Sequence, residues 1–351
     1  MTNKINGISL FSGAGIGEMY LKDVNIDIKI ANELIFSRAK LYTFFYPKTK
    51  MIIGDITKKE ILDQINFEIK NNNCKFLIAT PPCQGMSTLG KKDYENDERN
   101  YLIFYVIEII KNNKFDYIII ENVPKFLNFL FPYNNNFYTI FSILIQEFGD
   151  IYNIKKFILN SCNYGVSQNR SRAFIKMWKK NLNWFNHSES KEINLKEAIG
   201  FLPSLESGES SNIKWHYAKK HNDRDILAMK HTSTGKSALK NDFYYPKKIN
   251  GEAIKGFHNT YKRMHWNKPS PARTMNSGNI GGHNNVHPGR LLSDGTYSDA
   301  RVLTLRELFI ISSLPPDLDL PNWCTDTFIR NIIGEAIPPK FLKEIIKGIK
   351  K

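Results

Sequence analysis

Residues 5–18 have the sequence Ile5-Asn-Gly-Ile-Ser-Leu-Phe11-Ser-Gly13-Ala-Gly15-Ile-Gly17-Glu18, in which an apolar run leads into a glycine-rich turn. The run predicts a buried strand, and glycines at a strand-to-helix turn let a ligand approach the backbone closely. A glycine motif alone is weak evidence, because an ordinary tight turn has the same composition. The segment therefore favours an α/β sheet with a ligand crevice at the end of its first strand.

Apolar runs and helical stretches alternate through the first 180 residues. The predicted strands are Ile5–Phe11, Ile26–Asn32, Met51–Ile53, Phe76–Ala79, Tyr117–Glu121, Tyr152–Asn160 and Ala173–Met177. The predicted helices are Gly17–Lys22, Ser37–Phe45, Lys58–Lys70, Leu102–Lys111 and Thr139–Phe148. Alternation of this kind predicts a doubly wound α/β fold with a mixed sheet.

The pattern changes after Trp184. Residues 186–300 are polar, basic and rich in Gly, Ser, Asn and His, and helical character returns near 303–311 and 338–349. We expect a large domain formed by residues 1–185 and 326–351, and a smaller loop-rich domain with a hinge over 186–325.

The bulk composition excludes several classes of protein. The chain has 351 residues, 42% of them hydrophobic, which is enough for a sizeable core. No apolar run is long enough to span a membrane, and the N-terminus lacks the layout of a secretory signal. The four cysteines form no C-x-x-C pair, so we expect no metal site, and their scarcity indicates a reducing cytoplasm.

The net charge of +15 has two explanations. One is a solvated, lysine-rich surface without a specific partner. The other is a polyanionic partner, which the distribution favours. Residues 211–270 hold thirteen Lys and Arg against four Asp and Glu, a net charge of +9, and aromatic and histidine side chains lie among them. Clustered positive charge with aromatic side chains is typical of nucleic-acid binding.

Acidic residues follow the second and third predicted strands. Glu33 ends the second strand, where a carboxylate can accept hydrogen bonds from ribose hydroxyls, and Asp55 ends the third. Each acid alone would more often be a cap or turn residue. Together they indicate a ligand at the carboxyl edge of the sheet.

Two further motifs follow the fourth and fifth predicted strands. The first is Thr80-Pro81-Pro82-Cys83-Gln84-Gly85-Met86-Ser87, in which two prolines stiffen the backbone before a cysteine. A lone cysteine is usually a small buried hydrophobe, but a loop of this composition is an unusual place for one. The second motif, Glu121-Asn122-Val123-Pro124, occupies the same topological position one strand further on.

Taken together, these segments resemble the cytosine-5 DNA methyltransferase family, as found in type II restriction–modification systems. The similarity covers nearly the whole chain, in the family's order. Three later segments belong to it: Asn163-Tyr164-Gly165-Val166 with Gln168-Asn169-Arg170-Ser171-Arg172, then Arg273-Thr274, then Gly334-Glu335-Ala336-Ile337-Pro338. The resemblance implies an S-adenosylmethionine-dependent, Rossmann-like fold, with the basic region as the target-recognition domain.

The resemblance also implies a mechanism. Cys83 would add as a thiolate to carbon 6 of cytosine, so that carbon 5 can attack the methyl group of S-adenosylmethionine. Glu121, in a protonated form, would donate to ring atom N3. Arg172 would hold the cytosine O2, and Arg170 would support the nucleophile loop or a phosphate. The ring is hidden in a duplex, so the base must be flipped out.

The remaining site residues are carried over from the same motifs. Those expected to bind the cofactor are Phe11, Ser12, Gly13, Ala14, Gly15, Gly17, Glu33, Leu34, Asp55, Ile56, Pro82, Leu102, Glu335 and Ala336. Those expected to contact DNA are Gln84, Ser87, Gln168, Arg273 and Thr274. The loop from Met86 to Arg99 would close over the flipped base, although without the resemblance it would be a plain surface loop.

The sequence departs from the family pattern at three places. Ile16 replaces a second adjacent glycine, Glu335 replaces the usual asparagine, and Ile311-Ser-Ser-Leu314-Pro315 replaces Gln-Gly-Phe-Pro. Two alternatives therefore stay open: a transfer-RNA cytosine-5 methyltransferase and a non-catalytic protein that binds DNA or cofactor. We expect a monomer in the bacterial cytoplasm, near the nucleoid, with double-stranded DNA as substrate and a restriction endonuclease as functional partner.

Overall fold

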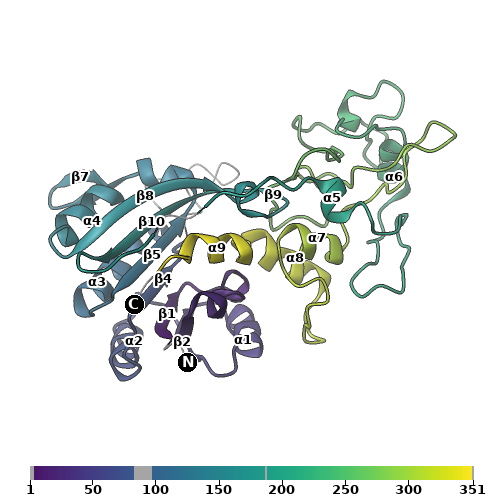
Figure 1. Cartoon of the computed structure of the whole chain (residues 1–351). Coiled ribbons are helices and arrows are strands. Elements are labelled where there is room, and N and C mark those ends of the chain that lie inside the picture. Colours follow the sequence, from purple (N-terminus) through teal and green to yellow (C-terminus); the bar gives the residue numbers. More distant parts are fainter. Residues whose placement is uncertain (1–3, 83–96, 186–187, 350–351) are drawn as a thin grey trace. The chain divides into compact units, whose positions relative to one another are not determined.

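The computed structural model describes residues 4–82, 97–185 and 188–349, which group into two compact units. The sheet unit consists of Met1–Asn160, Ser171–Ser188 and Leu342–Lys351, and the loop-rich unit of Ser161–Arg170 and Glu189–Phe341. Each unit is described by itself below, and Figure 1 shows the elements of both.

The sheet unit is built on a mixed sheet that has seven strands within the described residues, in the order β3-β2-β1-β4-β5-β10-β8. Its strands are β1 Ile5–Leu10, β2 Ile26–Glu33, β3 Lys50–Ile53, β4 Phe76–Ala79, β5 Tyr117–Asn122, β8 Tyr152–Asn160 and β10 Ser171–Lys179. The first five pair in parallel, and β10 is antiparallel to both of its neighbours. This confirms the predicted mixed α/β fold.

The strand order reverses at β1, which lies between β2 and β4. In open α/β sheets, ligands bind outside the carboxyl ends of the strands at such a reversal. The glycine turn follows β1 and Thr80 follows β4, so both lie at this position.

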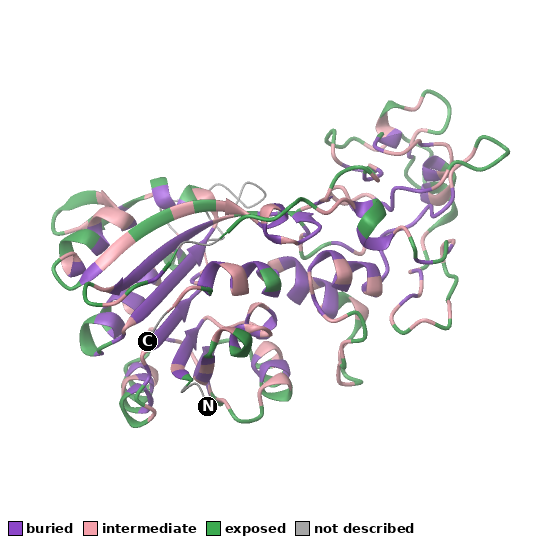
Figure 2. Ribbon diagram, viewed as in Figure 1, coloured by how far each residue is buried: buried purple, intermediate pink, exposed green. Residues whose placement is uncertain are grey.

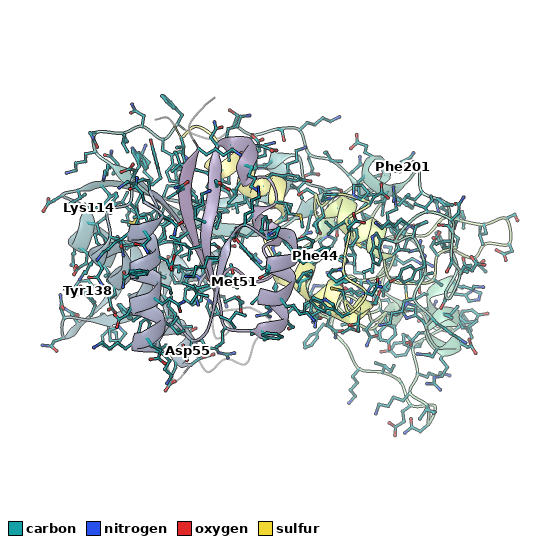
Figure 3. The ribbon with its side chains drawn as sticks, turned by 90° about the horizontal axis from the view of Figure 1, so that it is seen from below. Phe44, Met51, Asp55, Lys114, Tyr138 and Phe201 are labelled. Atoms are coloured by element: carbon teal, nitrogen blue, oxygen red, sulfur yellow. The ribbon has the colours of Figure 1, made fainter. Side chains whose placement is uncertain are left out.

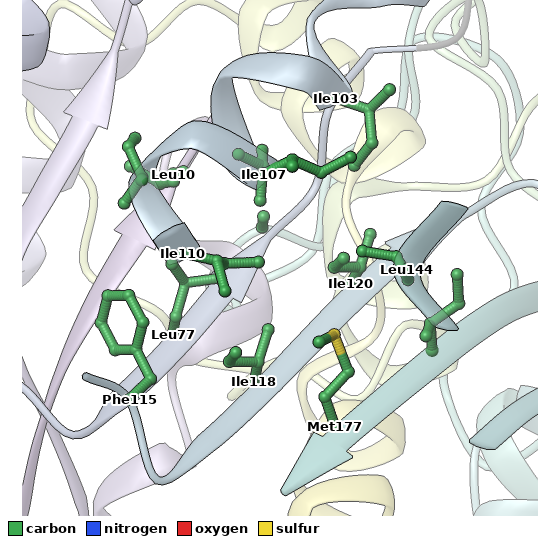
Figure 4. Packing of buried hydrophobic residues seen from close by; sticks show 14 of the residues in the cluster. Leu10, Leu77, Ile103, Ile107, Ile110, Phe115, Ile118, Ile120, Leu144 and Met177 are labelled. Atoms are coloured by element: carbon green, nitrogen blue, oxygen red, sulfur yellow. The ribbon is translucent and has the colours of Figure 1, made fainter. Parts of the chain in front are cut away.

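Three helices pack on one face of the sheet: α2 Lys59–Asn71, α3 Ile103–Asn112 and α4 Ile140–Phe148. Their isoleucines and leucines meet inward side chains of the strands in one hydrophobic cluster, part of which is drawn in Figure 4. The strands of the sheet interior are accordingly buried along their length (Figure 2). Helix α1 Phe36–Phe45 contacts β2 and β3, and a two-stranded hairpin, β6 Leu130–Tyr133 and β7 Asn136–Thr139, precedes α4.

One expected helix is absent from the sheet unit. The prediction of a helix at Gly17–Lys22 is wrong, because the described chain forms two short 3₁₀ turns there, Ile16–Glu18 and Leu21–Val24. Gly15 adopts a left-handed conformation before the first turn and Asn25 does so after the second. Left-handed residues interrupt a right-handed helix, so these two positions bound the segment, and Gly17, a poor helix former, lies within it.

The loop-rich unit contains short elements joined by long turns. They are β9 Gln168–Asn169, α5 Leu195–Ile199, α6 Asp223–Lys230, β11 Ser270–Pro271, α7 Leu305–Ile311 and α8 Asp326–Glu335, with α9 Pro339–Ile346 beginning in this unit. This unit also contains a buried ion-pair group. The guanidinium of Arg301 lies 2.7 Å from Asp299 and 2.8 Å from Glu307, and all three side chains are buried.

Within the described part of the chain, no helix is long and apolar enough to cross a membrane.

Candidate active site

The glycine turn after β1 is held in an unusual backbone conformation. Phe11, Gly13 and Gly15 all have positive φ angles, 57°, 56° and 74°. The Ser12 N–H donates to Asn32 O at 3.0 Å, and the Gly15 N–H donates to Ser12 O at 3.0 Å. Left-handed residues are costly unless the surroundings fix them, so this turn is preorganised.

Glu33 closes this turn with its side chain. Its carboxylate accepts hydrogen bonds from the Gly13 N–H and the Ile35 N–H, both at 2.8 Å. Each carboxylate oxygen has a second lone pair, which remains suited to a ribose hydroxyl. A β-carbon built on Gly13 would have no heavy atom within 4 Å, so open space adjoins this turn. The residues present therefore fit a nucleoside ligand such as S-adenosylmethionine.

The other expected cofactor residues of the sheet unit lie around this edge. Asp55 follows β3, where Figure 3 labels it, and its carboxylate accepts from the Thr57 N–H at 2.9 Å. Ile56 is buried and Leu34 is exposed. Pro82 and Leu102 are half-buried, which agrees with packing against a ligand but also with an ordinary surface position.

A buried carboxyl group, that of Glu18, follows the same turn. Glu18 accepts hydrogen bonds from Ser9 Oγ at 2.5 Å and from the Tyr42 hydroxyl at 2.6 Å. Burial raises the pKa of Glu18 to about 7, against the lowering effect of these two hydrogen bonds. The Tyr46 hydroxyl donates to Gly15 O at 2.7 Å, which ties α1 directly to the turn.

Two hydrogen bonds join the glycine turn, the proline motif and the glutamate motif. Thr80 Oγ1 donates to Phe11 O at 3.0 Å. Asn122 Nδ2 donates to Pro81 O at 3.0 Å, and this amide is buried. The chain two residues before Cys83 is thus fixed to the residue after Glu121.

Glu121 and Arg172 form an ion pair at the same edge. Arg172 Nε lies 3.0 Å from Glu121 Oε1, and the exposed fractions of the two side chains are 16% and 9%. Arg172 Nη1 donates to Ser171 O at 2.7 Å. Within the described residues no partner is found for Arg172 Nη2, so this nitrogen can donate to a bound base.

Three predicted residues fall outside the part of the chain that the structure describes. They are Cys83, Gln84 and Ser87, together with most of the expected lid from Met86 to Arg99. Their assignments stay predictions.

The loop-rich unit holds the remaining expected residues, and several are buried. Arg170 donates to Arg273 O at 3.0 Å and to Glu335 O at 2.8 Å, so it links two motifs of this unit through their backbones. Gln168 donates to Ser312 Oγ and accepts from the Arg273 N–H. The Arg273 guanidinium donates to Pro271 O and Asn284 O. These contacts indicate that Arg170, Gln168 and Arg273 position the backbone.

Thr274, Glu335 and Ala336 are half-buried in the same unit. The carboxyl group that Glu335 introduces therefore has partial access to solvent. Among the described residues, no group of His, Cys, Asp or Glu is arranged to hold a metal ion.

Residues 5–351 match the model of the family described as C-5 cytosine-specific DNA methylase. The chain belongs to this family. The predicted family, fold and enzyme class are thereby confirmed.

Two relatives of this methylase are similar to it over most of their length. It is 47% identical over 353 residues to the Type II methyltransferase M1.HgaI of Avibacterium volantium, covering 99% of each chain. It is 27% identical to the Type II methyltransferase M1.HphI of Haemophilus parahaemolyticus, covering 98% of this chain and 86% of the relative. The crystal structure of a prophage-encoded Escherichia coli protein, assigned as a DNA modification methyltransferase, has a TM-score of 0.72 at 18% identity and covers 98% of each chain.

The sequence analysis of this methylase missed the residues that support its motifs. Glu18, Tyr42, Tyr46 and Asn122 were given no role, although each is buried or nearly buried and hydrogen-bonded at the edge of the sheet. One signal was available. Tyr42 and Tyr46 are four residues apart, so they share one face of a helix, and a tyrosine hydroxyl in an apolar face needs a partner.

Proposed function

We propose that this methylase transfers a methyl group to carbon 5 of a flipped cytosine, in a specific double-stranded DNA sequence, through a covalent adduct with Cys83. Methylation of cytosine in DNA follows from the family and from relatives named Type II methyltransferases. The names also indicate a restriction–modification system, in which the methyl mark protects host DNA from a partner endonuclease.

One observation carries the mechanistic part of the proposal. The hydrogen bonds from Thr80 to Phe11 and from Asn122 to Pro81 join the ends of β1, β4 and β5. One edge of the sheet therefore carries the glycine turn, Thr80 and Pro81 of the proline motif, and Glu121. A reaction between a bound cofactor and a base needs this proximity, because fixed geometry supplies much of the rate enhancement.

The family generally uses S-adenosylmethionine, and we propose that Glu33 and Asp55 bind its ribose and adenine beside the glycine turn. When bound, it would supply a methyl group on a sulfonium centre. We assign packing against it to Pro82 and Leu102, and further contacts to Glu335 and Ala336.

The side chains of the chain would act on the base in sequence. The Cys83 thiolate adds to carbon 6, and the electron pair of the 5,6 double bond becomes available at carbon 5. Glu121, after it has taken up a proton, donates that proton or a hydrogen bond to N3 as negative charge builds on the ring, and Arg172 Nη2 donates to O2. After methyl transfer, a proton acceptor removes the proton from carbon 5. The electron pair of that bond re-forms the 5,6 double bond, and the Cys83 thiolate leaves carbon 6.

The direct test measures methyl transfer to duplex DNA, with the modified sites mapped by bisulfite sequencing. The wild type should methylate cytosine at one recurring sequence, and Cys83→Ala should not. Cys324→Ala is the matched control, because Cys324 is partly exposed and lies in the loop-rich unit. Full activity of Cys83→Ala would remove the nucleophile from the proposal.

A second candidate substrate is transfer RNA. The chain is 28% identical over 211 residues, 59% of its length, to a tRNA (cytosine(38)-C(5))-methyltransferase of Spodoptera frugiperda. Stronger similarity to Type II methyltransferases favours DNA. Side-by-side assays on duplex DNA and on tRNA separate the two substrates, and methyl transfer to tRNA alone would overturn the DNA assignment.

The remaining parts of the proposal concern organisation. We propose that residues 1–185 and 326–351 carry catalysis and cofactor binding, and that residues 186–325 recognise the target. We further propose a cytoplasmic, nucleoid-associated monomer that does not engage membranes. Light scattering after gel filtration would test the monomer, and a mass near 81 kDa, about twice the chain mass of 40.6 kDa, would contradict it.

A further inference from the structure

A polar cavity of about 580 Å³ lies within the loop-rich unit. Three segments supply most of its lining, namely residues 219–222, residues 275–279 and residues 327–331 of α8, and Asp225 of α6 completes it. The first two segments belong to the basic region and to the loop after Thr274. The third belongs to α8, for which no DNA contact was expected.

Cations dominate the wall of this cavity. Lys219, Lys220 and Arg330 line it, against one lining carboxylate, Asp225. That carboxylate already accepts a hydrogen bond from Asn222 Nδ2 at 2.6 Å. A second carboxylate, that of Asp326, pairs with Arg330 at the cavity, so the three cations exceed the two nearby carboxylates by one charge.

His221 also lines the cavity, and the positive charges around it affect its protonation. Burial is the main cause that lowers the pKa of His221 to about 4. The positive charges of Lys219, Arg330 and Arg301 lower it further, and the carboxylate of Asp326 raises it. The ring is accordingly neutral at physiological pH. A wall that disfavours a further positive charge favours an anion.

Arg330 is buried with incomplete hydrogen bonding. Its exposed fraction is 2%, and Nε donates to Asp326 Oδ1 at 2.7 Å while Nη1 donates to Leu303 O at 2.9 Å. Nη2 is buried and has no partner in the described residues. A buried N–H without an acceptor is costly, and a ligand oxygen would remove that cost after a small shift of the guanidinium.

A glycine lets two of the cations converge. A β-carbon on Gly278 would lie 3.1 Å from Lys219 Nζ and 3.2 Å from Arg330 Cδ, closer than most real contacts. Lys219 Nζ is also 3.9 Å from Asp326 Oδ1, the carboxylate that Arg330 binds. The ammonium and guanidinium groups thus share one corner of the cavity.

We propose that this cavity binds a backbone phosphate of the DNA substrate together with its sugar. Its volume lies in the range of sites that hold small ligands, so it exceeds the needs of a lone phosphate. Lys and Arg are the side chains that DNA-binding proteins use for phosphate oxygens, and a phosphate contact carries no sequence preference. The inference rests on the proposed function, since it assumes that DNA is the substrate.

The test compares two adjacent lysine pairs. Lys219→Ala/Lys220→Ala removes two cavity cations, of which Lys220 is exposed and Lys219 is half-buried. Lys58→Ala/Lys59→Ala removes the same charge from an exposed pair at the start of α2. Binding of a fluorescent duplex is measured by anisotropy between 50 and 200 mM salt, on a duplex with the methylated sequence and on one without it.

The cavity variant should bind both duplexes more weakly, on the order of tenfold, and should reduce the slope of log K against log salt by about 1. The α2 variant should keep the wild-type slope. An unchanged slope in the cavity variant, with normal binding by the wild type, would overturn this inference and leave the proposed function intact. Absence of DNA binding and methylation in the wild type would overturn both.

A parallel measurement separates DNA phosphate from free phosphate. The melting temperature of the wild type is followed as inorganic phosphate is added to 10 mM. If phosphate raises it, the cavity variant abolishes that rise, and the DNA slope of the variant is unchanged, then the cavity binds a free anion and the DNA assignment is wrong. A changed DNA slope supports the assignment whether or not free phosphate binds.

Discussion

Arg172 Nε lies 3.0 Å from Glu121 Oε1, across the antiparallel strands β10 and β5. The register pairs Glu121 with Phe174, so Arg172, two residues before Phe174 on β10, projects from the same face. Both side chains are largely withdrawn from solvent. Removing one partner of such a pair leaves the other as an uncompensated charge, so each residue depends on the other.

Arg172→Lys should lower the single-turnover rate of methyl transfer by about 10²-fold, because it removes the Nη2 donor proposed for cytosine O2. The measurement is transfer of a labelled methyl group to duplex DNA under saturating cofactor. Lys180→Ala, an exposed cation just beyond β10, is the control and should retain the wild-type rate. A rate for Arg172→Lys within twofold of wild type would contradict the proposed contact.

Asn122→Ala should destabilise the protein by about 1–3 kcal/mol, because Pro81 O loses its buried donor. It should also slow methyl transfer, since the proline motif is no longer tied to the glutamate motif. Urea unfolding measures the first effect and single-turnover kinetics the second. The exposed Asn136→Ala serves as control. Loss of stability without any change in rate would show that the bond is structural only.

Tyr46→Phe should raise the KM for S-adenosylmethionine several-fold with little change in kcat. The hydroxyl group donates to Gly15 O at 2.7 Å, so its loss loosens the turn that binds the cofactor. A single hydrogen bond of this kind is worth about 0.5–1.5 kcal/mol. Initial rates at varied cofactor concentration provide the measurement, with Tyr138→Phe on the hairpin as control. A fall in kcat at constant KM would argue against this role.

Glu18 makes stability depend on pH in a specified direction. Its folded pKa, about 7, is above the ordinary value of 4.5, so the folded state binds the proton more tightly than the unfolded state. The resulting stability is fully present below pH 4.5 and is lost as the pH rises toward 7. A shift of this size corresponds to about 3 kcal/mol.

Glu18→Gln should remove this dependence, because the amide does not titrate. Urea unfolding of both proteins at intervals between pH 4.5 and 8 provides the comparison. The difference in unfolding free energy, wild type minus variant, should fall between pH 5 and 7 and be constant above pH 7.5. If the unfolding free energies of the two proteins differ by a constant amount across the whole pH range, then the pKa of Glu18 is not raised in the folded state.

The sheet was predictable from sequence because its strands are short apolar runs that end in polar or glycine-rich turns. The seven predicted strands of the sheet unit each overlap an observed strand. Helix α8 was missed, since its apolar residues are interrupted by Arg330 and Asn331, which face the polar cavity. The Gly17–Lys22 helix was wrong because local glycine and asparagine conformations overrode a weak helical pattern.

The site was predictable where the chain itself carries a motif, and not where tertiary contacts decide a role. Glu33 and Glu121 lie at the strand ends where the sequence places them. The burial of Gln168 and Arg273 could not be inferred, because amide and guanidinium side chains normally face solvent. Gln168 bonds to Ser312, which is 144 residues away in the sequence, and Arg273 bonds to Asn284, which belongs to none of the motifs.

The central claim is that the sulfur of Cys83 bonds to carbon 6 of the target cytosine. Its most direct test is mass spectrometry of the methylase after incubation with S-adenosylmethionine and a duplex that carries 5-fluorocytosine at the methylated position. Fluorine at carbon 5 cannot leave as a proton does, so the account predicts a stable adduct on the Cys83 peptide of the wild type and none in Cys83→Ala. Methylation of ordinary duplex without any trapped adduct, or an adduct on Cys74, Cys162 or Cys324, would contradict it.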